Sequence, residues 1–225
     1  MTGQELRETR RQLRWTQQQA ATKLGVSQPY LSLLENGQRR VPLHLVTRLA
    51  RYTSLPASAL PLNDETAFNP QAFAASLGAL GYPRFGYLAS AGHRENPATL
   101  LLTALRQDHL EPRLTEALPW VLLHHPNLDW NWLVDRAKQD NLQNRLGFLV
   151  SLARELAEKR SGATPATRFA HWERALDDAR LAKVDSLARR LTPAEQQYFH
   201  VHRSPTASHW NLLTGLTADA LQYAE

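Results

Sequence analysis

Two glutamines, Gln17 and Gln28, lie eleven residues apart, and each stands at the start of a short helical pattern. Only Gly25, Val26 and Ser27 separate the two patterns. A glutamine side chain ends in a planar amide that offers N–H donors and an acceptor oxygen. Such an amide can pair with a partner that presents an acceptor and a donor side by side, or it can simply solvate a helix end. Folding alone does not require this spacing, so both interpretations stay open at this point.

Helical patterns fill the first 61 residues around these glutamines. Thr16 is a good N-cap for the second helix, and Ser27 is a good N-cap for the third. Gly25 supplies the left-handed conformation that commonly ends a helix. The patterns predict five helices, over residues 4–14, 16–24, 27–37, 42–52 and 56–60.

The third helix has two different faces. At roughly 100° per residue, Leu31 and Leu34 centre the face that should be buried. The opposite face has almost no charge, and it carries Gln28, Pro29, Ser32 and Leu33. Leu33 therefore points to water unless a ligand covers it. Such a face is odd for a solvated surface but natural for a helix that enters a DNA groove.

Basic side chains are concentrated near the N-terminus. Residues 1–61 hold nine lysines and arginines against three acidic residues, a net charge of +6. The remaining residues hold 17 basic and 18 acidic side chains, so that the whole chain carries +5. A basic head on a nearly neutral body indicates a polyanionic partner for the head alone, although a solvated basic surface without a ligand would have the same composition.

The composition excludes several kinds of site. The chain has no cysteine, which excludes disulfides, zinc sites with thiolate ligands and cysteine nucleophiles, and which fits a reducing compartment. No apolar run approaches the roughly 18 residues of a membrane span, and the N-terminal residues are too charged for a secretory signal. We therefore expect a cytoplasmic protein without membrane contact and without a cofactor.

Residues 16–37 contain the pattern T-Q-x-x-x-A-x-x-L-G-V-S-Q-x-x-L-S-x-L-E-N-G. This long pattern resembles the lambda-repressor-like (Cro/repressor-type) helix-turn-helix domain, and the resemblance covers residues 4–61, about a quarter of the chain. In that family the second helix of the pair lies in the major groove of DNA. The resemblance implies that Gln28 pairs with an adenine edge through both amide atoms, while Gln17 braces Gln28 and touches a phosphate.

Further roles follow from the same resemblance. Pro29 and Leu33 offer no hydrogen-bonding group and would contact a thymine methyl, whereas Ser32 can bond to either kind of base. Family members that carry polar residues at the positions of Pro29 and Leu33 differ from this chain, so the DNA sequence that they recognise cannot be assigned to it. Arg10 and Glu35 match an interior ion pair that locks the first helix to the third. Phosphate contacts are expected from the Asn36 backbone amide, Arg39, Arg40, Arg11 and Arg14.

The rest of the chain also has helical patterns, which predicts an all-α protein. Four capping side chains each precede a proline, an arrangement typical of helix starts: Asn69-Pro70, Asn96-Pro97, Thr164-Pro165 and Thr192-Pro193. We expect a helix-turn-helix domain at 1–62 and a linker at 63–97 that holds a short helix and a loop rich in glycine and aromatic residues. An all-helical C-terminal domain should fill 98–225, with a subdivision near 161–165.

The body contains a cluster of tryptophans and a cluster of histidines that could each form a ligand site. Three tryptophans could line a ligand pocket, although aromatics at helical spacing more often form the core: Trp120, Trp130 and Trp132. His200 and His202 lie two residues apart, which turns their rings about 200° from each other on a helix. We therefore expect no metal site at this pair or at the nearby His209.

Self-cleavage, as in phage-type repressors with a serine protease domain, is the enzymatic alternative. Ala91-Gly92 matches the dipeptide that such proteins cut. The nucleophile and base would need a β framework, yet the candidates Ser151, Lys138 and Lys159 fall in helical patterns. The sequence contains no phosphate-binding loop or carboxylate cluster elsewhere, so we expect no enzymatic activity.

Taken as a whole, the sequence predicts a sequence-specific DNA-binding regulator, in the form of a homodimeric repressor bound to double-stranded DNA. In one version it is an antitoxin-type autorepressor whose residues 66–225 bind a toxin. The alternatives are a stand-alone regulator with a ligand-sensing helical domain, and a protein-interaction module whose head does not bind DNA. An exposed apolar patch on the body would favour a protein partner, and an enclosed pocket around Trp120–Trp132 would favour a sensor.

Overall fold

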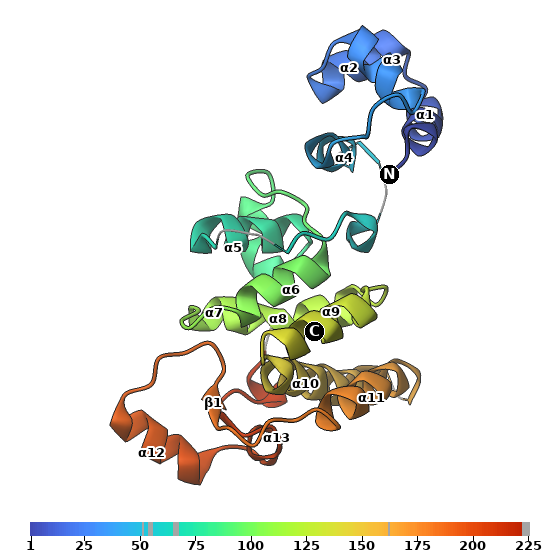
Figure 1. Ribbon diagram of the computed structural model, residues 1–225. Helices are drawn as coiled ribbons and strands as arrows, with labels where there is room; N and C mark the ends of the chain where they lie inside the picture. The colour runs from blue at the N-terminus through green and yellow to red at the C-terminus, as the bar shows by residue number, and fades with distance from the viewer. Residues whose placement is uncertain (51, 54–55, 65–67, 162, 222–225) are drawn as a thin grey trace. The chain divides into compact units, whose positions relative to one another are not determined.

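A computed structural model defines residues 1–50, 52–53, 56–64, 68–161 and 163–221, without the side chains of 160–166 (Figure 1). Within these residues the protein is predominantly helical, which confirms the predicted all-α class. The strands of the described residues are β1 (Asp185–Ser186) and β2 (Leu212–Leu213), which pair in parallel. The chain divides into two compact units, one of residues 1–62 with 94–96 and the other of residues 63–93 with 97–225.

The first unit begins with helices whose ends follow from local chemistry. Thr2 and Thr16 each form a capping box with the residue three positions later, so α1 and α2 start where side chains satisfy their first amides. The fifth predicted helix is a 3-10 turn, η1. The described elements are α1 (Gly3–Gln12), α2 (Gln17–Leu24), α3 (Gln28–Glu35), α4 (Leu43–Ala50) and η1 (Ala57–Ala59).

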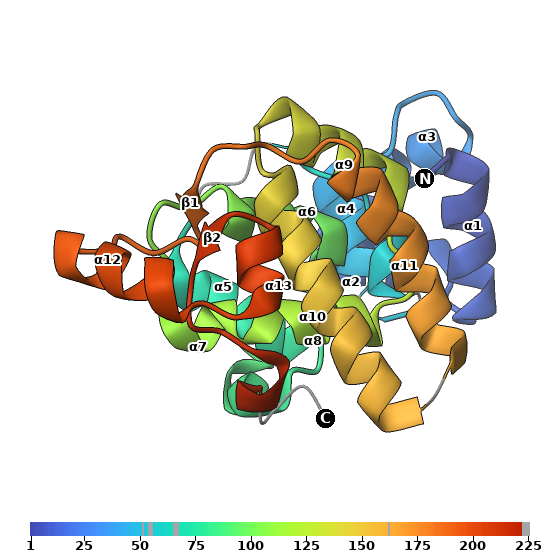
Figure 2. The ribbon, with the colours of Figure 1, turned by 90° about the horizontal axis from the view of Figure 1, so that it is seen from below.

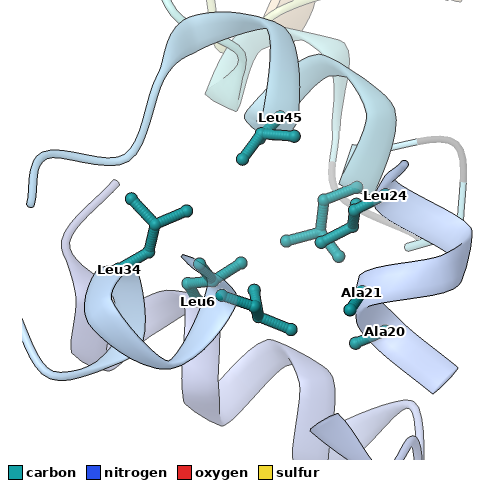
Figure 3. Close-up of a cluster of buried hydrophobic side chains, with 8 residues drawn as sticks. Leu6, Ala20, Ala21, Leu24, Leu34 and Leu45 are labelled. Carbon is teal, nitrogen blue, oxygen red and sulfur yellow. The ribbon is translucent and has the colours of Figure 1, made fainter. Parts of the chain in front are cut away.

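A small hydrophobic core holds these helices together (Figure 3). Leu31 and Leu34 of α3 are completely buried, as the spacing of the third helix predicts. Burying a leucine side chain contributes roughly 1.5–3 kcal/mol. The cluster therefore fixes which face of α3 turns inward. Its members are Leu6, Ala20, Ala21, Leu24, Leu31, Leu34, Leu45 and Leu49.

The second unit is a stack of helices around α10, whose 19 residues make it the longest described helix. α10 packs on α8, α9, α11 and α13, and both views show α11 beside it (Figures 1 and 2). The described elements are α5 (Pro70–Ala79), η2 (Pro83–Leu88), α6 (Pro97–Leu105), α7 (Pro112–Thr115), α8 (Ala117–His124), α9 (Trp130–Gln139), α10 (Gln143–Ser161), α11 (Ala163–Asp177), α12 (Pro193–His202), α13 (Pro205–His209) and η3 (Ala218–Ala220).

Buried polar side chains at the start of α10 tie distant segments together. The Asn144 amide donates to Leu181 O at 2.9 Å and accepts from Leu181 N at 2.8 Å. Arg145 holds the Asp185 carboxylate with two hydrogen bonds of 2.7 and 3.0 Å and donates to Leu105 O at 2.8 Å. These contacts position the chain before β1 and the end of α6 on the same helix.

The tryptophans of the body are mainly core residues. Trp120 is buried and lies edge-on to Tyr82, and the buried Trp130 stacks on Trp172 with ring centroids 5.4 Å apart. Trp210 is fully buried, and a Cβ added at Gly147 would come within 2.3 Å of its ring. Folding thus accounts for the burial of Trp120 and Trp130.

Residues 63–93 pack within the second unit rather than standing apart from it. α5 contacts η2, and Phe85 of η2 is buried. Ala91-Gly92 lies against α5, because a Cβ at Gly92 would be 2.0 Å from Ala75 O. The expected subdivision near 161–165 falls at the junction of α10 and α11, where residue 162 and the surrounding side chains lie outside the described residues.

Among the described residues, no helix combines the length and the apolar character that crossing a membrane requires.

Candidate nucleic-acid interface

The turn between α2 and α3 sets the angle between the two helices. Gly25 ends α2 in the left-handed conformation, with φ at +66°, and the Val26 amide donates back to Ala21 O at 3.0 Å. The Ser27 hydroxyl then accepts the Tyr30 amide at 3.3 Å and starts α3. Local sequence therefore produces a helix, a three-residue turn and a second helix.

The outward face of α3 is the surface expected from the sequence. Gln28, Pro29 and Leu33 are exposed, and Ser32 is half-buried. Leu33 keeps 36% of its surface accessible, which is high for a leucine in the middle of a helix that packs its other face on a core. All four predicted base-reading positions therefore line one side of α3 away from Leu31 and Leu34.

A chain of hydrogen bonds links this face to the interior. Gln28 Nε2 donates to Gln17 Oε1 at 3.2 Å, and Gln17 Nε2 donates to Glu35 Oε2 at 3.0 Å. An ionised carboxylate only accepts hydrogen bonds, so Glu35 fixes the Gln17 amide with its nitrogen inward and its oxygen toward Gln28. Gln17 in turn draws the nitrogen of the Gln28 amide toward itself. The orientation of both amides is thus set by one buried charge.

Arg10 neutralises that buried charge. Its Nε lies 2.6 Å from Glu35 Oε1, its terminal nitrogens bind Glu35 Oε2 at 3.1 Å and Trp15 O at 2.8 Å, and the Glu35 side chain has no exposed surface. Burial, the largest single influence, acts to raise the pKa of Glu35. Hydrogen bonds from Arg10 and Gln17, with the charges of Arg10 and Arg7, outweigh it, so the pKa of Glu35 is lowered. The same hydrogen bond raises the pKa of Arg10.

Arg7 is a neighbour that the sequence analysis did not single out. It lies 3.7 Å from Glu35 Oε2 and also donates to the side-chain oxygen of Asn36. Its position one turn before Arg10, on the same side of α1, was the available signal. Arg7 therefore holds the Asn36 side chain at the end of α3.

The residues predicted to contact phosphates differ in where they lie and in whether they are available. Arg39 and Arg40 are exposed just after α3, and the Arg39 guanidinium lies 5.9 Å from the centre of the Tyr30 ring. Arg11, in the last turn of α1, and Arg14, just after the helix, are exposed. The Asn36 backbone amide already donates to Ser32 O at 3.0 Å, so in this conformation its hydrogen is not available for the predicted phosphate contact.

Comparison with known proteins agrees with this geometry over the first unit. Residues 3–61 match the family model of a helix-turn-helix domain, which confirms the predicted class of the N-terminal domain. No curated protein and no solved structure matches the chain. Residues 3–61 are therefore a helix-turn-helix domain, and a domain of this class indicates a DNA-binding regulator.

Proposed function

We propose that the protein is a sequence-specific transcriptional repressor that inserts α3 into the major groove of DNA. The observation that carries the proposal is the hydrogen-bonded series Gln28–Gln17–Glu35, which holds an exposed amide in one orientation at the start of α3. A helix of this kind meets base edges with its N-terminal residues. Gln28, the second of the two glutamines that lie eleven residues apart, is the first residue of α3.

Gln28 reads adenine in this proposal. Within the described contacts its side chain makes one hydrogen bond, to Gln17, which leaves Oε1 and one N–H for a ligand. Oε1 can accept from adenine N6 while Nε2 donates to N7, for roughly 1–3 kcal/mol of discrimination. Guanine presents two acceptors at these positions, so the fixed amide would oppose its oxygen to O6.

The other outward residues add apolar and neutral contacts. Pro29 and Leu33 fit the C5-methyl group of thymine, because neither offers a hydrogen bond and both are exposed. The Ser32 hydroxyl lies 3.5 Å from Asn36 Nδ2 and can rotate to serve a base of either kind. The half-site is therefore expected to combine one adenine with neighbouring thymines.

Arginines outside α3 hold the phosphates and set the register. Arg39 and Arg40 follow α3 in the chain and are exposed, and the exposed Arg11 and Arg14 lie in and just after the last turn of α1. Together with the +6 charge of residues 1–61, they supply the counterion-release part of the affinity. Gln17 and the Asn36 side chain can add polar contacts to the backbone.

A single domain of this size reads few base pairs, so we propose a homodimer that binds two half-sites about 34 Å apart and represses by occupying a promoter. The protein would act in the cytoplasm and without catalysis. As a second candidate, we propose an antitoxin-type autorepressor whose body binds a toxin. The exposure of Tyr198 (57%) and Val201 (74%) on α12 supports a protein partner for the body.

Selection of bound duplexes from a random pool by the full chain tests the proposal. The expected result is an enriched inverted repeat with an adenine in each half, and loss of that adenine preference in Gln28→Ala. Gln18→Ala is the matched control, because Gln18 is exposed on α2 and makes no described contact with Gln28. An unenriched pool would instead favour a head that does not bind DNA.

A further inference from the structure

The second unit contains a cavity that no part of the proposed DNA contact uses. It measures about 260 Å³, many times the roughly 10–15 Å³ of comparable volume that one water molecule needs. Its walls are mostly apolar and come from the segment around α7, from α12 and from the chain after β2. Leu110, Leu187, Phe199, Leu213 and Leu216 are the large apolar lining residues.

A second, more polar hollow of about 330 Å³ adjoins this cavity. Arg189 and Leu213 line both, so they stand at the boundary between an apolar and a polar space. Ser186, Gln196 and His200 contribute polar groups to the second hollow. The two spaces together suit a molecule with an apolar body and a polar end.

The charges at the boundary favour an anionic end. The Arg189 guanidinium makes one hydrogen bond within the described contacts, from a terminal nitrogen to Glu195 Oε1 at 2.7 Å, and about half of the side chain is exposed. A guanidinium carries five N–H donors, so several remain for a carboxylate. The two carboxylates among the linings are already paired, Glu116 with Arg84 at 2.7 Å and Asp185 with Arg145 at 2.7 Å.

We propose that this cavity binds a small amphipathic carboxylate, with its hydrocarbon part against Phe199 and Leu187 and its carboxylate on Arg189. Burial and a hydrogen bond fix the backbone next to Arg189. Ala188 is buried in the left-handed region, with φ at +49°, and its carbonyl accepts the Leu110 amide at 2.6 Å. A left-handed conformation costs a residue with a Cβ on the order of 1–3 kcal/mol, so the surrounding contacts must hold the backbone next to Arg189 in place.

The site also reaches α12, which has no buried residue of its own. α12 contacts the cavity through Phe199, and Glu195 in its first turn binds Arg189. Glu195 keeps two hydrogen bonds from Thr192 when Arg189 turns to a ligand, so the start of α12 stays capped. A bound carboxylate would therefore touch α12, the helix that also presents Tyr198 and Val201.

Calorimetric titration of the full chain with linear carboxylates from butanoate to decanoate, and with 1-octanol, tests the proposal. Affinity should rise about fourfold for each added CH₂ until the cavity is full, and then level off. Octanoate should bind at least about tenfold more tightly than 1-octanol, because only the carboxylate forms charge-assisted hydrogen bonds with Arg189.

Two variants and their controls separate the two parts of the site. Arg189→Gln should reduce octanoate affinity to that of 1-octanol, while Arg190→Gln, an equal loss of charge at an exposed arginine outside both linings, should leave it unchanged. Ala220→Trp fills the rim of the cavity and should abolish binding of both probes, whereas Ala194→Trp on exposed α12 surface should not. Circular dichroism confirms that each variant is folded.

Three outcomes overturn the proposal. They are no measurable heat with any carboxylate at millimolar concentration, equal affinities for octanoate and 1-octanol, and unchanged octanoate binding in folded Arg189→Gln or Ala220→Trp. None of these measurements involves DNA, so they do not depend on the proposed repressor function.

Discussion

At the scale of single residues, Glu35 organises the proposed recognition surface. Its carboxylate accepts hydrogen bonds from Arg10 at 2.6 Å and from Gln17 at 3.0 Å. Through Gln17 it also orients the Gln28 amide. The residue types and the Arg10–Glu35 pairing could be anticipated from the sequence. The Gln17–Glu35 bond could not, because it depends on how α2 packs against the end of α3 and not on local spacing.

Acid should weaken the first unit through Glu35. The pKa of Glu35 is lowered in the folded protein, so its contribution to stability is fully present above the ordinary glutamate pKa of about 4.3 and is lost as pH falls through the lowered value. Urea unfolding followed by circular dichroism should show a falling free energy of unfolding below about pH 4.3. Glu35→Gln should have a smaller slope in that window, and an identical slope would contradict the role given to Glu35.

Arg10→Met should destabilise the first unit by about 3–5 kcal/mol near neutral pH, because a buried carboxylate would lose its partner. Without Arg10, burial should also raise the pKa of Glu35. The free energy of unfolding of the first unit in urea measures the change. Arg11→Met is the control, because Arg11 is exposed on α1. Equal stability of the two variants would show that the ion pair contributes little.

At the scale of elements, helix starts were the part of the fold most open to prediction. Thr16, Ser27, Asn69 and Thr192 all cap helices as the sequence predicts, because capping depends on residues only two or three positions away. Thr164 does not precede its helix, since α11 begins at Ala163, and its side chain lies outside the described residues. The pairing of β1 with β2 had no comparable signal. Each strand has two residues, and the Arg145–Asp185 contact beside them joins positions 40 residues apart. The packing of residues 63–93 likewise depends on contacts such as that of Gly92 with Ala75.

The turn between α2 and α3 gives a prediction at this scale. Gly25→Ala should lower the stability of the first unit by about 1–2 kcal/mol, because a left-handed conformation is unfavourable for a residue with a Cβ. Gly25→Asn should lose less, since asparagine tolerates this region better. Thermal unfolding compares the two variants. Equal losses would mean that contact with Arg48, which a Cβ would approach within 2.6 Å, outweighs the backbone conformation.

At the scale of the whole molecule, the net charge and the two proposed binding sites are divided between two units. The first holds the net positive charge and the helix-turn-helix, and the second holds the cavity beside Arg189. The basic head could be located from the sequence because counting charges needs no structure. The cavity could not, because it brings Leu110, Phe199 and Leu216 together from separate parts of the chain.

Salt dependence measures how much of the binding comes from the phosphate contacts. Each phosphate neutralised adds roughly 0.9 to the slope of the logarithm of affinity against the logarithm of salt concentration. Arg39→Ala with Arg40→Ala should therefore reduce the slope by about 2 for each bound domain. Lys183→Ala with Arg190→Ala removes the same charge from the second unit and should leave the slope nearly unchanged. The reverse pattern would place the phosphate contacts on the second unit.

The most direct test of the account is a binding cycle that combines Gln28→Ala with 7-deazaadenine in the selected operator. This base lacks the N7 acceptor that Gln28 is proposed to use. The wild-type protein should lose about 1–3 kcal/mol of binding free energy on the modified operator, while Gln28→Ala should bind both operators equally and keep the wild-type affinity for unrelated DNA. If the modified base weakens Gln28→Ala as much as the wild type, Gln28 does not read adenine, and the central claim is wrong.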